Sequence, residues 1–566
     1  MEEILAGRWR AFGHLPISVT DPPRWHKDYL GGVDLTTNAV AFGLNHRALA
    51  SGADIKLIWE LSRWHQLTRL AMAAHVLGEA KAGWKCVHWL EHWVQHNQPY
   101  RGWNWTSALE AGMRLIQFTW IEALLQPFVT SGECESEMEQ LRYETLPSHV
   151  WFTWRHRSFG SSANNHLLGE LAGLIVATAR WPELSRWAVP LDELEELWND
   201  EVLAQFAEDG GNREQALHYH LFSFELCWHA RMALIAAGRK VNDAVEQRLE
   251  RAREFFVDVH GMREPWSYGD SDDAFVLPLF YDESQATPEW TAWMSAGRQG
   301  EAISYWIGDA NAPLRPRVVE DSPWRLYEDT GVAIGRSGNL VLRYDVSPQG
   351  YLTTAAHGHL DALHLSIWIG HTAMIIDPGT GAYYAHRELR SWLACAPAHN
   401  GPQTQLQRWP RRRAPFLWSG HHSRPSIIVE GKQALVAELG DGTIFARRSV
   451  EISGTSQVLV TDSVRTRSTQ QFFTVLWQFP PGAVCQVIEP YRFRVTHQGA
   501  NLEIVASADW ERADLATKPP SEAQVGEGTV SPHFRVVTWA PHLKLQARPK
   551  GDSPCVFSTL FLASND

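Results

Sequence analysis

The spacing of apolar residues changes once along this chain, from a helical period to a strand period. From about residue 50 to 310, apolar side chains recur at i, i+3, i+4 and i+7, the pattern of amphipathic helices. After about residue 315, short β-branched and aromatic runs are separated by Gly, Pro, Asp or Asn turns. The clearest helical segments are 54–80, 105–128, 164–181 and 213–238. The predicted architecture is therefore a helical region in the first part of the sequence and a sheet region in the second part.

A length of 566 residues exceeds the usual size of a single core, so we predict two large domains. We place the helical domain at residues 1–315 and the β-domain at 316–566. Several helices carry polar residues on a second face, which suits stacked helical hairpins with one side turned to a cavity. The regular spacing of the strands favours an antiparallel β-sandwich. The expected class is α+β, with the two kinds of structure in separate domains.

The net charge of −13 argues against a nucleic-acid or membrane-surface binder, although a local basic cleft can still take an anionic ligand. No apolar run approaches 18 residues, so we expect no membrane span. The first residues lack a basic stretch followed by an apolar one, so no signal peptide is recognised. The chain as it stands is predicted to be cytoplasmic, or periplasmic or secreted if a leader has been removed.

Histidines and carboxylates gather around a predicted hairpin in the second half. His357, His359 and Asp361 alternate just before an apolar run that turns at Gly370-His371 and returns through a second run. Asp377 then comes back beside the start of the first strand. With His399, which lies in a loop flanked by Pro and Gly, such a set can fill a tetrahedral site for zinc or a related divalent ion.

Two helical segments carry further candidates. Asn165 and His166 fall in the first turn of a predicted helix, where free N–H groups and the helix dipole favour an anion. Glu170 lies four residues later on the same face and can hold the imidazole; simple capping by the asparagines is the alternative. Tyr219 follows a Gly-rich turn and Glu214. It is either a packed aromatic or a phenol that transfers protons.

Taken in order, these motifs resemble the heparinase II/III-like polysaccharide lyases. The resemblance rests on NNHLLGELAGL, DGGNREQALHYH, GDSDD, HGHLDALHLSIWIG, IIDPGTGAYY and AHN, and runs from about residue 50 to 400. It implies an N-terminal incomplete (α/α) toroid and a C-terminal antiparallel β-sandwich. It also implies β-elimination of uronic-acid-containing polysaccharides, which makes the partner an anionic polysaccharide.

The resemblance also implies roles for individual residues. Asn165 and His166 would hold the uronate carboxylate, with His166 also a candidate base for one C5 epimer. Tyr219 would be the acid, or both base and acid, and His357 would face it from the β-domain.

A metal site follows from the same resemblance. His359, Asp377 and His399 match the family's ligands for an ion, most often zinc, with manganese or calcium as alternatives. Its role would be structural, ordering the loop that presents His357.

For the remaining substrate contacts we nominate Glu170, Glu214, Arg63 and Arg114, the two arginines because a polyanion needs cations inside the helical domain.

The leading functional hypothesis is a carbon–oxygen lyase acting on glycosaminoglycans such as heparan sulfate or heparin, hyaluronan or chondroitin. An alginate or oligoalginate lyase of the same fold is the main alternative, and a non-catalytic carbohydrate-binding protein is another. A toroid glycoside hydrolase needs two carboxylates flanking the bond, for which Asp209 and Glu214 are the best candidates. No prediction is made for the oligomeric state.

Overall fold

The computed structural model describes most of the chain. The described residues are 1–49, 52–129, 135–261, 263–264, 266–280, 286–296, 301–308, 322–404, 409–430, 432–440, 444–466, 472–522, 524–549 and 554–565. The predicted domain boundary near residue 315 lies outside them. Within them, no helix combines the length and apolarity that crossing a membrane requires.

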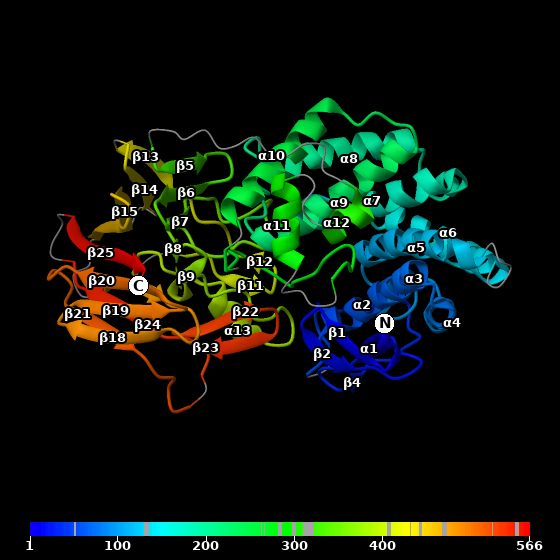
Figure 1. Ribbon diagram of the computed structural model, residues 1–566, viewed down its shortest axis with the longest axis horizontal. Coiled ribbons are helices and arrows are strands. Elements are labelled where there is room, and N and C mark those ends of the chain that lie inside the picture. The colour runs from blue at the N-terminus through cyan, green and yellow to red at the C-terminus, as the bar shows by residue number, and fades with distance from the viewer. Residues whose placement is uncertain are drawn as a thin grey trace.

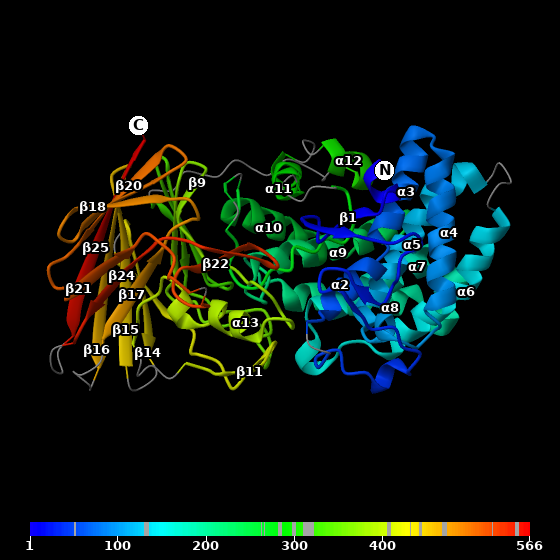
Figure 2. The same cartoon turned by 90° about the horizontal axis from the view of Figure 1, so that it is seen from below.

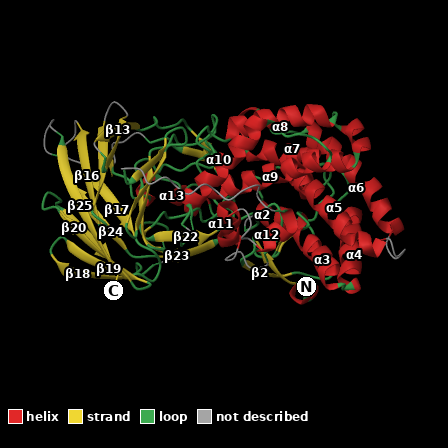
Figure 3. Cartoon of the chain, turned by 45° about the horizontal axis from the view of Figure 1, so that its top comes forward, coloured by secondary structure: helices red, strands yellow, loops and turns green. Residues whose placement is uncertain are grey.

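Helices fill the N-terminal half and strands fill the C-terminal half, so the predicted fold class is confirmed (Figures 1 and 3). Helices α5 and α7 pack side by side and approach each other closely at Gly112 and Gly173. A Cβ atom on Gly173 would lie 2.4 Å from the carbonyl oxygen of Gly112, so only glycine permits this approach. The helices are α1 (Glu2–Leu5), α2 (Ile55–Ser62), α3 (His65–Leu77), α4 (Ala80–His96), α5 (Ala108–Val129), α6 (Glu135–Arg155), α7 (Asn165–Arg180), α8 (Leu191–Gln205), α9 (Leu217–Ala236), α10 (Asp243–Val259), α11 (Ala286–Ala296) and α12 (Glu301–Ile307).

The helical segment 54–80 is two helices rather than one. Asp54 caps α2 by accepting a hydrogen bond of 3.1 Å from the backbone N–H of Lys56. Trp64, which lies between α2 and α3, has a φ of +67° and a fully buried side chain. A left-handed residue breaks a helix, so the chain turns there while the apolar spacing continues on both sides.

Three antiparallel sheets dominate the C-terminal half and share one hydrophobic core, to which Leu342, Val450 and Val475 each contribute from a different sheet. The first contains β5 (Trp324–Tyr327), β6 (Val332–Ser337), β7 (Leu340–Asp345), β8 (Leu365–Ile369) and β9 (Thr372–Ile375). The second runs β13 (Ser426–Glu430), β14 (Ala434–Gly440), β15 (Ile444–Ser453), β16 (Gln457–Thr466), β25 (Cys555–Asn565), β20 (Ala500–Ala506), β19 (Arg492–His497) and β18 (Val484–Glu489). The third runs β10 (Gln403–Thr404), β17 (Phe473–Gln478), β24 (His542–Ala547) and β21 (Arg512–Ala516).

The predicted hairpin is confirmed. Strands β8 and β9 pair through Ile367 and Ile375 and turn at Gly370-His371. The side-chain amide of Asn400 donates to the carbonyl oxygens of Leu365 and Ile376, at 3.0 and 2.9 Å. This amide fixes the open end of the hairpin, where Asp377 lies.

Small elements join the two halves. A hairpin of β22 (Thr529–His533) and β23 (Val536–Trp539) extends from the sheets toward the helices (Figure 2). Phe534 at its tip contacts Phe12 with 5.1 Å between ring centroids, and Arg535 forms an ion pair of 2.7 Å with Asp54. Phe12 belongs to the N-terminal segment around β1 (Arg8–Ala11) and β2 (Leu15–Ser18), whereas β3 (Lys27–Asp28) and β4 (Val33–Asp34) form a separate pair.

Candidate active site

A cleft with a volume of about 570 Å³ lies where helical residues meet loops of the strand half. The helical half contributes Lys56, Asn164, His166 and Tyr219 to its wall, and the strand half contributes His357, Tyr383 and Phe416. The two Trp side chains at its edge, Trp59 and Trp105, are only 5% and 1% exposed. They are therefore core residues rather than platforms for sugar rings.

Tyr219 and His357 meet face to face in this cleft. Their rings stack with centroids 3.8 Å apart and an interplanar angle of 19°. The hydroxyl of Tyr219 lies 3.1 Å from the hydroxyl of Tyr383. Burial and the carboxylates of Asp272, Asp270 and Glu214 raise the pKa of Tyr219 well above its usual value. The phenol therefore keeps its proton and is available as an acid.

Asp270 connects both histidines of the His-x-His pair. One carboxylate oxygen lies 3.1 Å from Nδ1 of His357, and the other lies 2.9 Å from Nε2 of His359. Arg390 donates to both oxygens, and its positive charge helps to hold the pKa of Asp270 well below the usual range despite burial. Because a carboxylate accepts from Nδ1–H of His357, Nε2 of that ring keeps its lone pair for another group.

Asn165 is held by Glu214 beneath the cleft wall. Its side-chain nitrogen lies 2.8 and 3.1 Å from the two carboxylate oxygens of Glu214, and its backbone N–H donates to the same group. The side chain of Asn164 donates to Glu214 at 2.8 Å and also borders the cleft. Glu214 is 2% exposed. Its carboxylate orients the two asparagines and does not line the cleft, so a substrate contact by Glu214 stays a prediction without structural support.

His166 borders the cleft, but Glu170 does not hold it. Burial and the neighbouring His357 and Lys56 lower the pKa of His166 to about 3, so the imidazole is neutral near pH 7. Glu170 is fully buried and instead accepts hydrogen bonds of 2.7 and 2.8 Å from the backbone and hydroxyl of Ser158. The predicted pairing with His166 is absent, because Ser158 in the loop before α7 donates to both carboxylate oxygens. A substrate contact by Glu170 stays a prediction.

Replacing Glu170 with Gln should flatten the pH dependence of stability between pH 4.5 and 8. Burial raises the pKa of Glu170 from 4.5 to about 8, so in this window the folded state keeps a proton that the unfolded state has lost. This contribution to stability is complete below pH 4.5 and falls as the pH rises toward 8. Thermal unfolding of wild type and Glu170→Gln at pH 5 and pH 8.5 measures the difference. Exposed Glu183→Gln is the control; parallel profiles for Glu170→Gln and wild type would contradict this assignment.

Arg63 and Arg114 do not line the cleft, so the structure gives no support to a substrate contact by either, and that role stays a prediction. Arg63 is 2% exposed and forms two hydrogen bonds of 2.8 and 2.7 Å with Glu110. Arg114 is fully buried and donates to His149 and to the backbone carbonyl of Asn104. Both guanidinium groups lie inside the helical core, where the Nη1 atom of each has no hydrogen-bond partner. Arg47 lines the cleft together with Lys56, which is ion-paired with Asp272.

His359, Asp377 and His399 form a buried group that can hold a metal ion. One ligand atom from each lies within 4.8 Å of the others. Nδ1 of His359 and Nε2 of His399 are buried without a hydrogen-bond partner, whereas Nδ1 of His399 lies 3.4 Å from Oδ2 of Asp377. Buried polar atoms are rarely left unsatisfied, and two imidazoles with one carboxylate are the donors that zinc takes. The three residues therefore fit a divalent ion.

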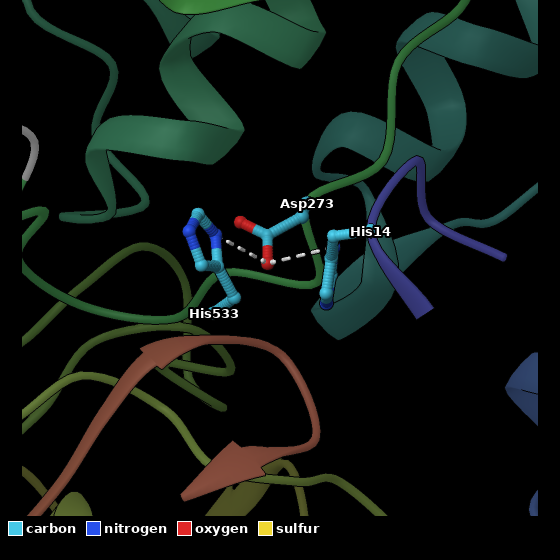
Figure 4. A group of neighbouring side chains, drawn as sticks. All are labelled: His14, Asp273 and His533. Atoms are coloured by element: carbon cyan, nitrogen blue, oxygen red, sulfur yellow. Dashed lines mark ion pairs between the residues drawn. The ribbon is translucent and has the colours of Figure 1, made fainter. Parts of the chain in front are cut away.

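A second group of similar composition ties the N-terminal segment to the hairpin of β22 and β23. Figure 4 shows His14 and His533 on either side of Asp273, with their Nδ1 atoms 3.9 and 3.7 Å from one carboxylate oxygen. The ring nitrogens of His14 also lie 2.9 and 2.8 Å from the carbonyl oxygens of Phe12 and Phe534. Because backbone carbonyls already engage both nitrogens, we assign this group to holding the segments together rather than to a metal.

Sequence reasoning missed several residues of the site. Asp270 lies in the GDSDD motif that carried part of the family resemblance, but the motif gave no indication of its partners. Tyr383 lies in IIDPGTGAYY, another quoted motif. Arg390 and Lys56 had no recognisable signal, since an isolated cation in a helix is usually solvated.

Comparisons with known proteins agree with this architecture. The protein-family model described as Heparinase II/III N-terminus matches residues 27–268. A second family model, described as Heparinase II/III-like, C-terminal, matches residues 320–538. No curated protein matches the sequence.

Solved structures with similar folds include lyases. A mutant of heparan sulfate lyase HepC from Pedobacter heparinus has a TM-score of 0.63 at 16% identity, covering 100% of this chain and 82% of that chain. A heparinase III structure has a TM-score of 0.67 at 14% identity, covering 92% of this chain and 80% of that chain. Another heparinase III has a TM-score of 0.65 at 18% identity, covering 97% of this chain and 85% of that chain. At these identities the likeness shows the fold alone.

Proposed function

The chain belongs to the heparinase II/III-like family of polysaccharide lyases, and we propose that it cleaves a uronate-containing glycosaminoglycan by β-elimination. The observation that carries the proposal is the stacking of Tyr219 on His357 in the wall of a cleft that His166 also lines. The names of the structural neighbours, heparan sulfate lyase and heparinase III, support a glycosaminoglycan as the polymer.

Elimination at a uronate demands three things of the protein. The C5 proton must be removed, the negative charge that develops toward the carboxylate must be stabilised, and the leaving oxygen at C4 must be protonated. The C5–H electrons form the C4=C5 double bond as the C4–O bond breaks. Each demand corresponds to a residue type present at the cleft.

We assign the substrate carboxylate to the first turn of α7, where Asn164 and His166 border the cleft. Asn165 is 1% exposed and is held by Glu214 behind that wall, so its contact with the carboxylate stays a prediction. His166, neutral because of burial, can donate one N–H without carrying a charge. Hydrogen bonds that strengthen as the carboxylate gains enolate character lower the barrier to C5 deprotonation.

Tyr219 suits the acid, and the two histidines suit the base. The buried phenol holds its proton and can deliver it to the leaving oxygen at C4. For the other C5 epimer, Nε2 of His357 or a ring nitrogen of His166 is the candidate acceptor of the C5 proton. Where proton and leaving group lie on the same side, Tyr219 would have to enter as the phenolate, accept the C5 proton and pass it to the leaving oxygen, and its raised pKa opposes that first ionisation.

We assign His359, Asp377 and His399 to a structural divalent ion, with zinc as the expected metal. When bound, the ion supplies charge that fixes the three ligands in place. His359 also contacts Asp270 through its other nitrogen, and Asp270 contacts His357. The protein's own residues thus extend from the ligand set to the cleft, and they orient His357.

The glycoside hydrolase alternative lacks support in the described part of the chain. Asp209 accepts hydrogen bonds of 2.9 and 2.5 Å from the backbone and hydroxyl of Thr330. Glu214 is buried against the asparagines. Since neither carboxylate borders the cleft, the pair cannot flank a glycosidic bond.

Incubation with a panel of polymers tests the proposal. Heparan sulfate, heparin, hyaluronan, chondroitin and alginate are compared by the ultraviolet absorbance of the 4,5-unsaturated uronate. We expect the chromophore with at least one glycosaminoglycan. Absorbance with alginate alone would contradict a glycosaminoglycan substrate and support the alginate-lyase alternative. Cleavage without absorbance, detected as new reducing ends, would indicate hydrolysis and refute the proposal.

A further inference from the structure

A second pocket beside the cleft is lined by arginines. Its volume is about 260 Å³, and its wall includes Arg47, Arg387, Arg390, Arg412 and Arg413 but no Asp or Glu among the described residues. It adjoins the cleft, because Arg47 and Tyr383 border both. The pocket forms where α13 (Arg387–Leu393) lies beside the hairpin of β11 (Arg412–Ala414) and β12 (Leu417–Trp418), in the middle of the molecule (Figures 1 and 2).

Arg390 is the one arginine of the five whose charge is neutralised within the described chain. It is 1% exposed, forms a two-pronged ion pair with Asp270 and also donates to the carbonyl oxygen of Pro415. Arg390 therefore belongs to the scaffold that holds both the pocket and the active site. A ligand cannot replace Asp270 without exposing that buried carboxylate.

The other four arginines, by contrast, form no ion pair with any described residue. Arg47, Arg387 and Arg413 are exposed. Arg387 donates only to the backbone carbonyl of Arg47, at 3.4 Å. A cluster of unpaired positive charges is unusual in a chain with a net charge of −13 and creates a local field that attracts anions.

Arg412 gives the second, independent indication of a ligand. Its guanidinium stacks over Trp418 at 4.2 Å and donates through Nη1 to the carbonyl oxygen of Pro415. Its Nε and Nη2 atoms are shielded from solvent and have no hydrogen-bond partner. An unsatisfied, shielded guanidinium edge is costly in free energy and matches the paired oxygens of a sulfate or carboxylate.

We propose that this arginine pocket binds an oxyanion group, a sulfate or a carboxylate, on a sugar of the polymer next to the one being cleaved. The inference rests on the proposed function for the identity of the polymer. A water molecule occupies about 30 Å³, so a pocket of about 260 Å³ is larger than a lone ion needs and suits a charged group attached to a sugar ring. The shared wall with the cleft places that sugar on the same chain as the reacting uronate.

Equilibrium binding of two matched oligosaccharides tests the pocket. To prevent cleavage during the titration, a heparan sulfate hexasaccharide and its chemically desulfated counterpart are titrated by calorimetry into the Tyr219→Phe protein, alone and combined with Arg412→Gln, Arg413→Gln or Arg387→Gln. Unsaturated product is measured separately with the wild-type protein. Arg411→Gln is the control, since Arg411 is exposed in the same run of arginines but does not line the pocket. We expect about a tenfold loss of affinity in each pocket variant and no change in the control. Arg413 and Arg387 are exposed, so their substitution tests the pocket even if Arg412→Gln fails to fold.

The outcomes separate the two anions and the two proposals. A loss of affinity confined to the sulfated hexasaccharide assigns the pocket to sulfate. An equal loss of affinity for both hexasaccharides assigns it to the uronate carboxylate. If Arg413→Gln and Arg387→Gln bind the sugars as tightly as Arg411→Gln does, the proposal that this pocket binds an oxyanion is refuted, whether or not the protein is a lyase. Arginine-dependent binding without any unsaturated product would leave the pocket standing and refute the lyase function.

Discussion

Changing Tyr219 to Phe should lower the rate of uronate elimination by about a thousandfold, the effect typical of losing a positioned proton donor. The substitution removes only the hydroxyl, whose one described hydrogen-bond partner is the hydroxyl of Tyr383. The ring can still stack on His357, so substrate binding should change little. The loss should appear in kcat rather than in KM, measured from the initial rate of 4,5-unsaturated product.

A matched control separates chemistry from folding. Tyr344→Phe also removes a buried hydroxyl with one hydrogen bond, to the backbone carbonyl of Arg448, but in the sheet core away from the cleft. Both variants should show the circular dichroism of wild type, and only Tyr219→Phe should lose activity. A Tyr219→Phe protein with wild-type kcat would remove Tyr219 from the reaction.

Changing His399 to Ala should abolish stoichiometric metal binding, with affinity reduced at least about a hundredfold, since even substitutions behind a ligand cost ten- to a hundredfold. The wild-type protein should hold about one divalent ion per chain by elemental analysis. Removing it should lower the melting temperature, because the buried Nδ1 of His359 and Nε2 of His399 then lack partners, at a cost of about 1–3 kcal/mol each.

Activity should fall together with the metal, because His359 and His357 both contact Asp270. His88→Ala, which changes an exposed histidine on α4, is the control and should keep metal, stability and activity. If wild type dialysed against excess zinc retains no ion, the ligand assignment fails. In that case the three side chains would be an unfilled polar cluster.

Local motifs predicted the elements and the ligand group well. The period-two run after His364 and the Gly370-His371 turn correctly placed Asp377 near the start of β8. His399 joined that end because Asn400 donates to both strands of the hairpin. These outcomes depend on hydrogen bonding within one hairpin and its neighbouring loop, which the sequence pattern encodes directly.

Partners that come from distant segments could not be predicted in the same way. Glu170 had the correct spacing from His166 on a helix, yet Ser158 from the preceding loop took its carboxylate. Arg63 was expected in the cavity, yet Glu110 from another helix paired with it in the core. Helical periodicity identifies which residues share a face, but the competing donor or acceptor is set by tertiary packing.

The division of the site between the two halves has a consequence for how such a protein can be cut or recombined. A fragment ending before β5 would retain Tyr219 and His166 but lose the stacked imidazole, and the complementary fragment would retain His357 without its phenol. Produced separately, each piece would be inert; mixed, the pair would regain turnover only by docking. Fusing either fragment to an unrelated domain would therefore transfer its fold but not its catalytic activity.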